Sequence, residues 1–341
     1  MTLESRGTVP GKRRFIEVST LEDTMAVRCA DFHPMGHLFA VGSNSKSLHI
    51  CRTPSLTNIS RSHHPPTPDI LHNSPKHHKG SIYCLSWAPS GSLLATGSND
   101  KTIKMIRVSD DEDDDPGHVV EAVLPLHDGT VRDLTFLSGS GPCQLVSGGA
   151  GNCQVYLTDC ATASVIQAKT GHTKHILSVF SWHEGGPVFV SGSQDKTVRF
   201  WDTRTKACVR VVSYERAGVS GSPVSSCCVD QSGRLLVSGH EDASCALFDI
   251  RGQRFLQTFS PHSSDVRSVR LSPSSFYLLS TSYDCTIVLT DLQGNLTNHL
   301  PSLVVASHQD KVITGRWHPH HCSFLSTSAD KTSTVWTLPD I

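Results

Sequence analysis

A histidine, a serine or threonine and an aspartate recur along this chain in an order that superficially resembles a hydrolase triad. The clearest set is His172, Ser191 or Ser193, and Asp195, with Trp201 shortly after it. In a hydrolase these residue types would activate a serine for acyl transfer. The set recurs at several places, which a catalytic site would not do, and no Gly-x-Ser-x-Gly turn accompanies it. We therefore predict a structural role for these residues and no enzymatic activity.

Two histidine-rich stretches raise the question of a metal site. Structural zinc needs four converging ligands at tight spacing, and the sequence has no Cys-x-x-Cys pair. The glycine-rich motifs that cradle phosphates are also missing. We therefore predict no metal site, no cofactor and no small-molecule substrate. The residues concerned are His63, His64, His72, His77 and His78 in one stretch, and His318, His320, His321 and Cys322 in the other.

The composition excludes several classes of protein. The 341 residues include 30 Lys and Arg against 31 Asp and Glu, without the positive excess of a general nucleic-acid binder. No apolar run approaches the ~18 residues of a membrane span, and none follows the basic N-terminal residues as in a secretory signal. Twelve cysteines in such a chain indicate reduced thiols and a cytoplasmic protein. We expect most to be small buried apolar residues, among them Cys84, Cys153, Cys208, Cys245 and Cys285.

One phrase recurs seven times: an apolar run, small residues, a polar turn and a second alternating run. The clearest copy extends from Phe189 to Asp202, and the turns of successive copies are 42 to 55 residues apart. A unit of about 40–45 residues with four strands is the period of a propeller blade. A histidine precedes five of the turns by 22 to 24 residues: His78, His127, His172, His262 and His308. The turn positions are Ser45, Asp100, Gly151, Asp195, Asp242, Asp284 and Asp330.

With Gly171-His172 before the fourth turn and Trp201-Asp202 after it, the sequence resembles the WD-repeat family. The resemblance implies an all-β fold, a seven-bladed β-propeller of four-stranded antiparallel blades. It also implies that the recurring polar residues form a hydrogen-bonded chain joining the inter-blade loop, the turn and the third strand. It says almost nothing about function. The residues given this structural role are His78, His172, Asp100, Asp195, Trp201, Asp242, Asp284, Asp330 and Trp336.

The last copy supplies three strands before the chain ends, so its blade needs a fourth strand from elsewhere. Phe15–Leu21 is the candidate, because an open ring would leave an unpaired edge that invites aggregation. We therefore predict that residues 15–341 form one closed propeller, preceded by a disordered tail at residues 1–14.

Two insertions lengthen the spacing between copies. Residues 53–79 are rich in His and Pro, and we expect an outer strand at Asp69–Leu71 and otherwise a mobile loop. Residues 109–117 form a second loop that contains six consecutive acids, Asp110–Asp115. Such blocks are usually solvated.

The remaining candidate is an interaction surface. In a propeller the starts of the first strands and the turns between second and third strands share one face. Tyr and Arg, which anchor interfaces, are expected on this rim, and its cations favour an acidic partner. The predicted protein-binding residues are Arg28, Tyr83, Arg132, His175, Glu241, Arg267, Tyr283 and Lys311, with Asn44, Asn99 and Gln194 beside them.

Two stretches, Ala26–Cys51 and His77–Lys104, are similar to the propellers of neuronal WD-repeat proteins that associate with microtubules. The resemblance implies a cytoplasmic, cytoskeleton-associated scaffold whose partners are microtubule-associated proteins, including those that bind microtubule minus ends. The alternative is a substrate receptor or assembly subunit of another complex, such as a ubiquitin ligase. That alternative would use clustered arginines at the ring's centre and, usually, a helical adaptor-binding module, which this sequence does not contain.

Overall fold

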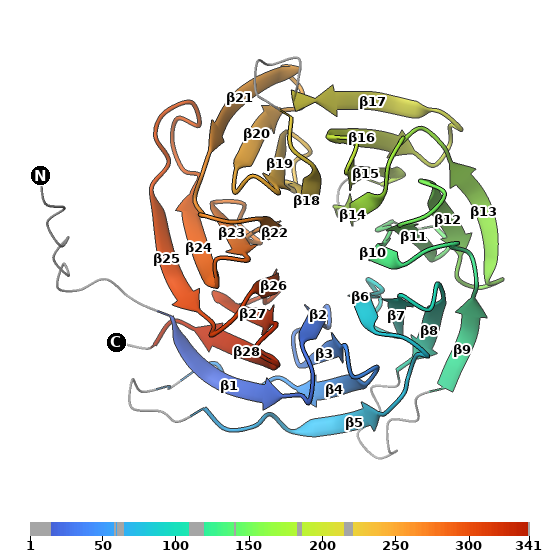
Figure 1. Cartoon of the computed structure of the whole chain (residues 1–341), viewed down its shortest axis with the longest axis vertical. Coiled ribbons are helices and arrows are strands. Elements are labelled where there is room, and N and C mark those ends of the chain that lie inside the picture. Colours follow the sequence, from blue (N-terminus) through green and yellow to red (C-terminus); the bar gives the residue numbers. More distant parts are fainter. Residues whose placement is uncertain are drawn as a thin grey trace, which may run out of the picture.

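Seven four-stranded antiparallel sheets surround a common axis (Figure 1), so the predicted all-β seven-bladed propeller is confirmed. The predicted tail, residues 1–14, and the predicted acidic loop, residues 109–117, lie outside the described residues. In the part of the chain that the structure describes, no helix has the length and apolar character needed to cross a membrane. The computed structural model describes residues 15–57, 59, 65–108, 119–139, 141–182, 186–214 and 221–339.

The blades are numbered in chain order, each from its innermost to its outermost strand. Blade 1 contains β2 (Val27–Phe32), β3 (Leu38–Ser43), β4 (Leu48–Arg52) and β5 (Ile70–Ser74). Blade 2 contains β6 (Ile82–Trp87), β7 (Leu93–Ser98), β8 (Ile103–Arg107) and β9 (Val119–Leu124). Blade 3 contains β10 (Val131–Phe136), β11 (Gln144–Gly149), β12 (Val155–Asp159) and β13 (Ser164–Lys169). Blade 4 contains β14 (Ile176–Ser181), β15 (Val188–Ser193), β16 (Thr197–Asp202) and β17 (Cys208–Ser213).

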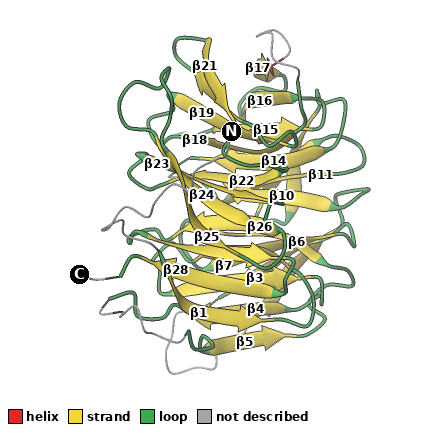
Figure 2. Ribbon diagram, turned by 60° about the vertical axis from the view of Figure 1, so that its left-hand side comes forward, coloured by secondary structure: helices red, strands yellow, loops and turns green. Residues whose placement is uncertain are grey.

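The remaining blades have the same order. Blade 5 contains β18 (Val224–Val229), β19 (Leu235–His240), β20 (Cys245–Asp249) and β21 (Arg254–Phe259). Blade 6 contains β22 (Val266–Leu271), β23 (Tyr277–Ser282), β24 (Thr286–Asp291) and β25 (Ser302–Ser307). Blade 7 contains β26 (Val312–Trp317), β27 (Ser323–Ser328), β28 (Thr332–Thr337) and β1 (Ile16–Glu22). Figure 2 shows these strands joined by loops.

The second strand of each blade is buried along almost its whole length, because neighbouring blades cover both of its faces. Every residue of β3 and β27 is buried. The small residues of the repeated sequence phrase let neighbouring blades pack this closely. A Cβ added at Gly97 would lie 2.7 Å from Val131 Cγ1 of the next blade. The core is therefore a series of layers between adjacent blades. One such layer joins Leu38 and Ile50 of blade 1 to Trp87 of blade 2.

The N-terminal strand closes the ring, as the sequence predicted. β1 pairs antiparallel with β28, from Ile16 opposite Thr337 to Glu22 opposite Thr332. Val18 and Leu21 of β1 are buried in a core cluster with Leu325 of β27. In Figure 1 the first and last strands of the chain lie side by side in one blade. Closure therefore rests on both backbone pairing and apolar packing.

Part of the insertion at residues 53–79 packs on the propeller. Its outer strand is β5, which begins one residue later than predicted and extends to Ser74. Ile59 is buried in the same core cluster as Leu21 of β1. The backbone N–H of Thr20 donates to the carbonyl oxygen of Pro66 at 3.1 Å. The expectation of a mobile loop is therefore wrong for these residues, because the insertion buries an apolar side chain.

All twelve cysteines are free thiols. Cys84 and Cys245 are buried as expected, whereas Cys153, Cys208 and Cys285 are partly exposed, so the expectation is wrong for these three. Cys153 and Cys285 lie in the turns between second and third strands, where their φ values are 58° and 68°. Four other blades place a lysine at this left-handed position and blade 5 an alanine, so the position lies in an exposed turn.

Candidate functional site

In each of four blades, the recurring polar residues form a hydrogen-bonded chain. In blade 4, Nδ1 of His172 lies 2.7 Å from Oδ2 of Asp195, and Nε2 lies 2.7 Å from Oγ of Ser191. Trp201 donates from Nε1 to the same Ser191 oxygen at 2.7 Å. Equivalent chains join His78, Thr96 and Asp100 in blade 2, His262, Ser280 and Asp284 in blade 6, and His308, Ser326, Asp330 and Trp336 in blade 7.

These chains hold loops together instead of presenting a nucleophile. Asp195 accepts further hydrogen bonds from the backbone N–H of Thr173 and from the hydroxyl of Thr197, at 3.1 and 2.6 Å. Burial raises the pKa of Asp195, but hydrogen bonds from His172 and Thr197 outweigh it and hold the pKa well below its usual range. Ser191 is fully buried. The set therefore ties the loop before β14 to the turn after β15.

Blade 1 makes an equivalent connection in which the positions are exchanged: the aspartate lies in the loop before the first strand, and the histidine lies on the third strand. Asp23, in the loop before β2, accepts hydrogen bonds from Ser43 and Ser45 at 2.9 and 3.1 Å. Nε2 of His49 on β4 lies 3.4 Å from the same carboxylate. At the predicted turn position, the hydroxyl of Ser45 thus donates to the carboxylate of Asp23, which lies in the loop before β2.

Blades 3 and 5 also depart from the common chain. His127 is hydrogen-bonded to Ser147, but its turn carries Gly151 in place of an aspartate. In blade 5 the buried Tyr214 takes the place of the histidine, and its hydroxyl is hydrogen-bonded to Ser238. Asp242, grouped with the other aspartates from sequence, is exposed and accepts hydrogen bonds from Ser244 in its own turn.

The histidine-rich stretches do not converge on a metal site within the described residues. His77 is hydrogen-bonded to Thr96, and Nε2 of His318 donates to the carbonyl oxygen of Gly36. Burial lowers the pKa of His77 to about 3 and that of His318 to about 4. His63 and His64 lie outside the described residues.

A β-bulge recurs at the start of the innermost strand in all seven blades. At each bulge the register with the second strand shifts by one residue, which leaves that residue without a partner and re-aims its side chain. All seven bulge residues line one small cavity on the ring axis. We call them the channel mouth: Arg28, Tyr83, Arg132, Leu177, Ser225, Arg267 and Ile313.

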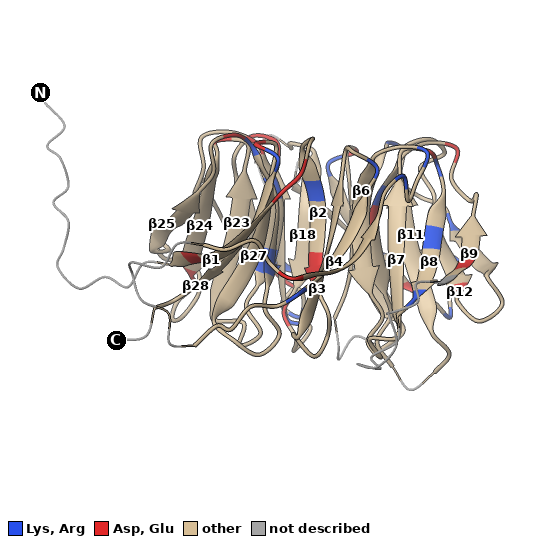
Figure 3. Ribbon diagram, turned by 90° about the horizontal axis from the view of Figure 1, so that it is seen from below, with Lys and Arg blue, Asp and Glu red and all other residues tan. Residues whose placement is uncertain are grey.

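The channel mouth opens on the face that carries the turns between second and third strands, which we call the turn face. Nε of Arg28 donates to Oδ1 of Asn44, which immediately precedes the first of these turns, at 2.5 Å. The backbone N–H of Asn44 donates in turn to Ala26 O at 2.9 Å. Figure 3 views the ring from the side and shows the loops at the ends of the strands forming its two faces. The predicted rim residues beside the turns therefore share a face with the channel mouth.

Four cations surround two tyrosines at this opening. The guanidinium carbon of Arg28 lies 4.4 Å from the ring centre of Tyr83, and that of Arg132 lies 5.1 Å from it. The guanidinium carbon of Arg267 lies 5.2 Å from the ring centre of Tyr283. Nζ of Lys311 lies 5.1 Å from the same centre. Such contacts contribute about 0.5–2 kcal/mol each and keep the cations in place.

The remaining predicted rim residues lie outside this cluster. His175 is exposed, and its Nδ1 accepts a hydrogen bond from the backbone N–H of Gly151 in the neighbouring turn. It precedes β14 by one residue, and Leu177 occupies the bulge position instead. Glu241 is half-buried near Arg267; burial raises the pKa of Glu241, and the arginine opposes that rise.

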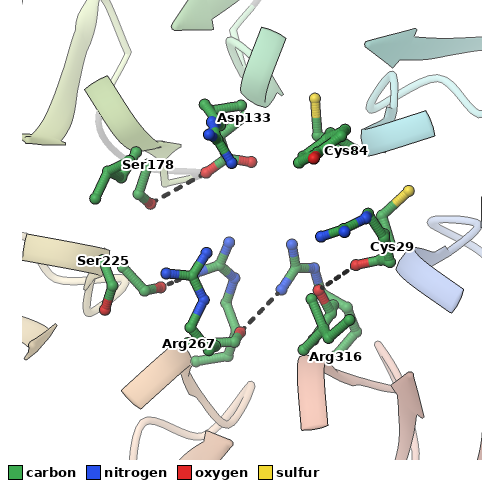
Figure 4. Close-up of a pocket in the computed structure, with 16 residues that line it drawn as sticks. Cys29, Cys84, Asp133, Ser178, Ser225, Arg267 and Arg316 are labelled. Carbon is green, nitrogen blue, oxygen red and sulfur yellow. Dashed lines mark hydrogen bonds between the residues drawn. The ribbon is translucent and has the colours of Figure 1, made fainter. Parts of the chain in front are cut away.

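Two arginines deeper in the channel were not identified from the sequence. Arg270 of β22 donates to Ser226 Oγ at 3.3 Å, and Arg316 of β26 donates to Ser268 Oγ at 3.2 Å. Both occupy the same place in their strands, four residues after the first buried valine, a signal that aligning the copies could have revealed. Figure 4 shows Arg316 near Arg267, with Asp133 and Ser178 across the cavity.

Comparison with known families agrees with this architecture. The family described as "WD domain, G-beta repeat" matches more than half of the chain, at residues 16–51, 70–107, 164–202, 211–249 and 253–291. The chain belongs to the WD-repeat family. Each matched WD repeat begins in the outermost strand of one blade and ends in the third strand of the next, as residues 70–107 span β5 to β8. The WD repeats therefore link every matched blade to its neighbour covalently.

Curated relatives of this WD-repeat chain include G-protein subunits. Guanine nucleotide-binding protein subunit beta-1 of Nicotiana tabacum is 28% identical over 257 residues, which cover 69% of this chain and 67% of the relative. Nuclear distribution protein nudF of Aspergillus niger is 25% identical over 283 residues, covering 76% of this chain and 60% of the relative. Nuclear distribution protein PAC1 of Coccidioides posadasii is 26% identical over 292 residues, covering 76% and 58%. The WD-repeat propeller identifies this chain as a protein-interaction scaffold.

Proposed function

We propose that this WD-repeat protein is a cytoplasmic adaptor for microtubule-associated proteins and that it binds them through its turn face. The observation that carries the proposal is the channel mouth together with Tyr283 and Lys311 beside it, where four cations surround two tyrosines. Arg and Tyr are the residue types that most often anchor interfaces. Cations held on one face favour and steer an acidic partner.

Two observations support a link to microtubules. The stretches that resemble microtubule-associated WD-repeat proteins, Ala26–Cys51 and His77–Lys104, include Arg28 and Tyr83 of the channel mouth. Proteins named for nuclear distribution are among the curated relatives. Microtubule-associated proteins, including those at minus ends, are therefore the proposed partners, and the cytoskeleton is the proposed location.

A second candidate is a substrate receptor or assembly subunit of another complex, such as a ubiquitin ligase. The arginines clustered at the ring's centre favour it, since such a receptor would use them to bind an acidic segment. The two candidates differ in whether the partner is bound to microtubules.

Co-pelleting with taxol-stabilised microtubules tests the proposal. The purified chain is mixed with microtubules over a series of salt concentrations, alone and with a microtubule minus-end-binding protein. We expect pelleting that weakens as salt rises, because screening reduces attraction between exposed charges. Pelleting only with the second protein would identify an adaptor that reaches microtubules through that protein. No pelleting in either case would exclude the microtubule proposal and favour the second candidate.

A pair of charge-reversal variants identifies the surface involved. Arg132→Glu with Arg267→Glu should weaken pelleting, while Arg52→Glu with Arg254→Glu should leave it unchanged. Arg52 and Arg254 serve as the control because their side chains are 57% and 71% exposed, and neither lines the channel mouth. Thermal unfolding of each variant confirms that it folds. Equal loss in both pairs would show a general charge effect instead of a turn-face site.

A further inference from the structure

The cavity on the ring axis has a strong excess of positive charge. Among the described residues that line it, five are arginines and one is a carboxylate, Asp133. That carboxylate is already engaged: it accepts hydrogen bonds from Ser178 Oγ at 3.1 Å and from the backbone N–H of Val179 at 2.9 Å. Cations partly removed from water without counter-charges are costly, so this lining favours an anion.

The two deeper arginines create a fixed positive field below the mouth. Arg316 donates to Ser268 Oγ and to the carbonyl oxygen of Gly315, and its Nε lies 3.8 Å from Asp31. Burial, together with the nearby charge of Arg270, lowers the pKa of Arg316 to about 10. The protein itself therefore positions these two arginines, and their charge extends towards the opening.

The mouth arginines retain unused hydrogen-bonding capacity. The Nε atoms of Arg132 and Arg267 are buried and have no hydrogen-bond partner. Burial lowers the pKa of Arg132, and the nearby charges of Arg267 and Arg28 lower it further. A buried N–H without an acceptor is destabilising, because it has lost its hydrogen bonds to water. An anion at the mouth would provide both the missing acceptors and the counter-charge.

The size and charge of the site favour a phosphate monoester over a carboxylate. The cavity encloses about 70 Å³. This is several times the ~10–15 Å³ that one buried water requires, so it accommodates one compact anion and no folded segment. A phosphate monoester carries about −1.5 to −2 charges at neutral pH, which matches the charge excess better than a single carboxylate does. Planar guanidinium groups also bind phosphate through paired hydrogen bonds.

We propose that the channel mouth binds the phosphate group of a phosphorylated partner protein, with Arg132 and Arg267 as its principal ligands. The inference rests on the proposed function, because it describes what the partner presents to the turn face. The phosphate enters the cavity, and the flanking peptide lies across the tyrosines and Lys311.

Isothermal titration calorimetry of the full chain at low salt tests this proposal. The probes are the peptide Gly-Gly-phosphoserine-Gly-Gly, the same peptide with serine or glutamate, and inorganic phosphate. We expect the phosphopeptide to bind about tenfold more tightly than the glutamate peptide, and inorganic phosphate to compete with it. Glutamate binding as tight as phosphoserine, or no binding of any phosphate probe, would overturn the proposal. Inorganic phosphate binding as tightly as the phosphopeptide would assign the site to free phosphates.

Variants locate the ligands. Arg132→Gln with Arg267→Gln should weaken phosphopeptide binding at least about tenfold, since each removes a charged fork. Arg52→Gln with Arg254→Gln removes the same charge from exposed positions and should preserve binding. Arg267→Lys keeps the charge without the fork and should still weaken binding, which separates specific contacts from net charge. Undiminished binding by a folded double mouth variant would refute this inference alone, because microtubule pelleting is measured independently.

Discussion

Nδ1 of His172 lies 2.7 Å from Oδ2 of Asp195, and both side chains are almost closed to solvent. The pair joins the loop before β14 to the turn between β15 and β16. Blade 5 lacks this pair, since Tyr214 replaces the histidine and Asp242 at the equivalent turn is exposed. Two aspartates at equivalent turns thus have different surroundings, which separates the contribution of the polar chain from that of the turn.

Asp195→Ala is expected to lower the free energy of unfolding by about 2–4 kcal/mol, because it leaves His172 buried without its acceptor. Asp242→Ala should cost less than about 1 kcal/mol, since it removes hydrogen bonds of an exposed turn. Urea unfolding followed by tryptophan fluorescence measures both. Unchanged stability of Asp195→Ala together with a lost hydrolytic activity would show that the set is catalytic.

Ring closure places the N-terminal strand in the apolar layer that joins blades 7 and 1. Leu21 of β1 is 3% exposed and packs in one cluster with Leu325 of β27. We expect Leu21→Ala and Leu325→Ala each to cost about 2–5 kcal/mol and to preserve a single thermal transition. Val120→Ala on the outer strand β9 is the control, because Val120 is 42% exposed and should cost under about 0.5 kcal/mol. A separate early transition in Leu21→Ala would show that β1 docks independently.

Repeat spacing predicted the blades because each blade must supply the same four strands. The closing strand was also predictable, since a three-stranded last blade needs a partner for its edge. The departures in blades 1 and 5 were not predictable from spacing. A buried hydrogen-bonded chain requires matched donors and acceptors, and Asp23 with His49 or Tyr214 with Ser238 satisfies that requirement as well as the common residues do.

The sequence located only part of the candidate site, because it does not reveal the β-bulges. His175 was grouped with Arg132 because each adjoins the first apolar residue of its strand, yet the bulge re-aims the residue that follows the apolar one, which is Leu177 in blade 4. A shift of one residue reverses the direction of a strand side chain. Arg270 and Arg316 lie within the innermost strands of blades 6 and 7. They were missed because they meet on the ring axis only through the arrangement of the blades in space.

Stability is expected to fall on mild acidification. Burial lowers the pKa of His77 to about 3, and those of His127 and His318 to about 4, from an ordinary value of 6.5. A group whose pKa is lower in the folded state stabilises the fold above its unfolded pKa, and this stability is lost as pH falls towards the folded value. The free energy of unfolding should therefore decline from about pH 6.5 to about pH 4. Urea midpoints measured across this range test the slope.

The carboxylates of the polar chains add a second loss at lower pH. Burial raises the pKa of Asp330, but hydrogen bonds from His308 and Thr332 outweigh it and leave the pKa well below its usual value. Its contribution is present above about pH 4 and is lost below that pH. His127→Asn should make the slope between about pH 6.5 and pH 4 shallower, whereas His175→Asn, at an exposed position, should not. A slope unaffected by His127→Asn would show that this histidine does not contribute.

Cys143 is the thiol that we expect to react first with iodoacetamide at neutral pH. It is partly exposed and precedes β11, and the backbone N–H of Cys160 donates to its carbonyl oxygen at 3.0 Å. A hydrogen bond from the Cys160 thiol lowers the pKa of Cys143, while that same contact and burial raise the pKa of Cys160. Cys322 is more exposed, but burial of its sulfur raises its pKa. Because the thiolate is the nucleophile, Cys143 should be modified before Cys322.

Peptide mass spectrometry after limited alkylation gives the order of reaction. Cys160→Ala removes the thiol that hydrogen-bonds to Cys143 and should slow the alkylation of Cys143, whereas Cys208→Ala, in blade 4, should leave its rate unchanged. If Cys322 reacts first in the unmodified chain, exposure decides the order. If Cys143 reacts first but Cys160→Ala does not slow it, its reactivity comes from the surrounding loop. Only the combination of early modification and sensitivity to Cys160 establishes that the neighbouring thiol activates Cys143.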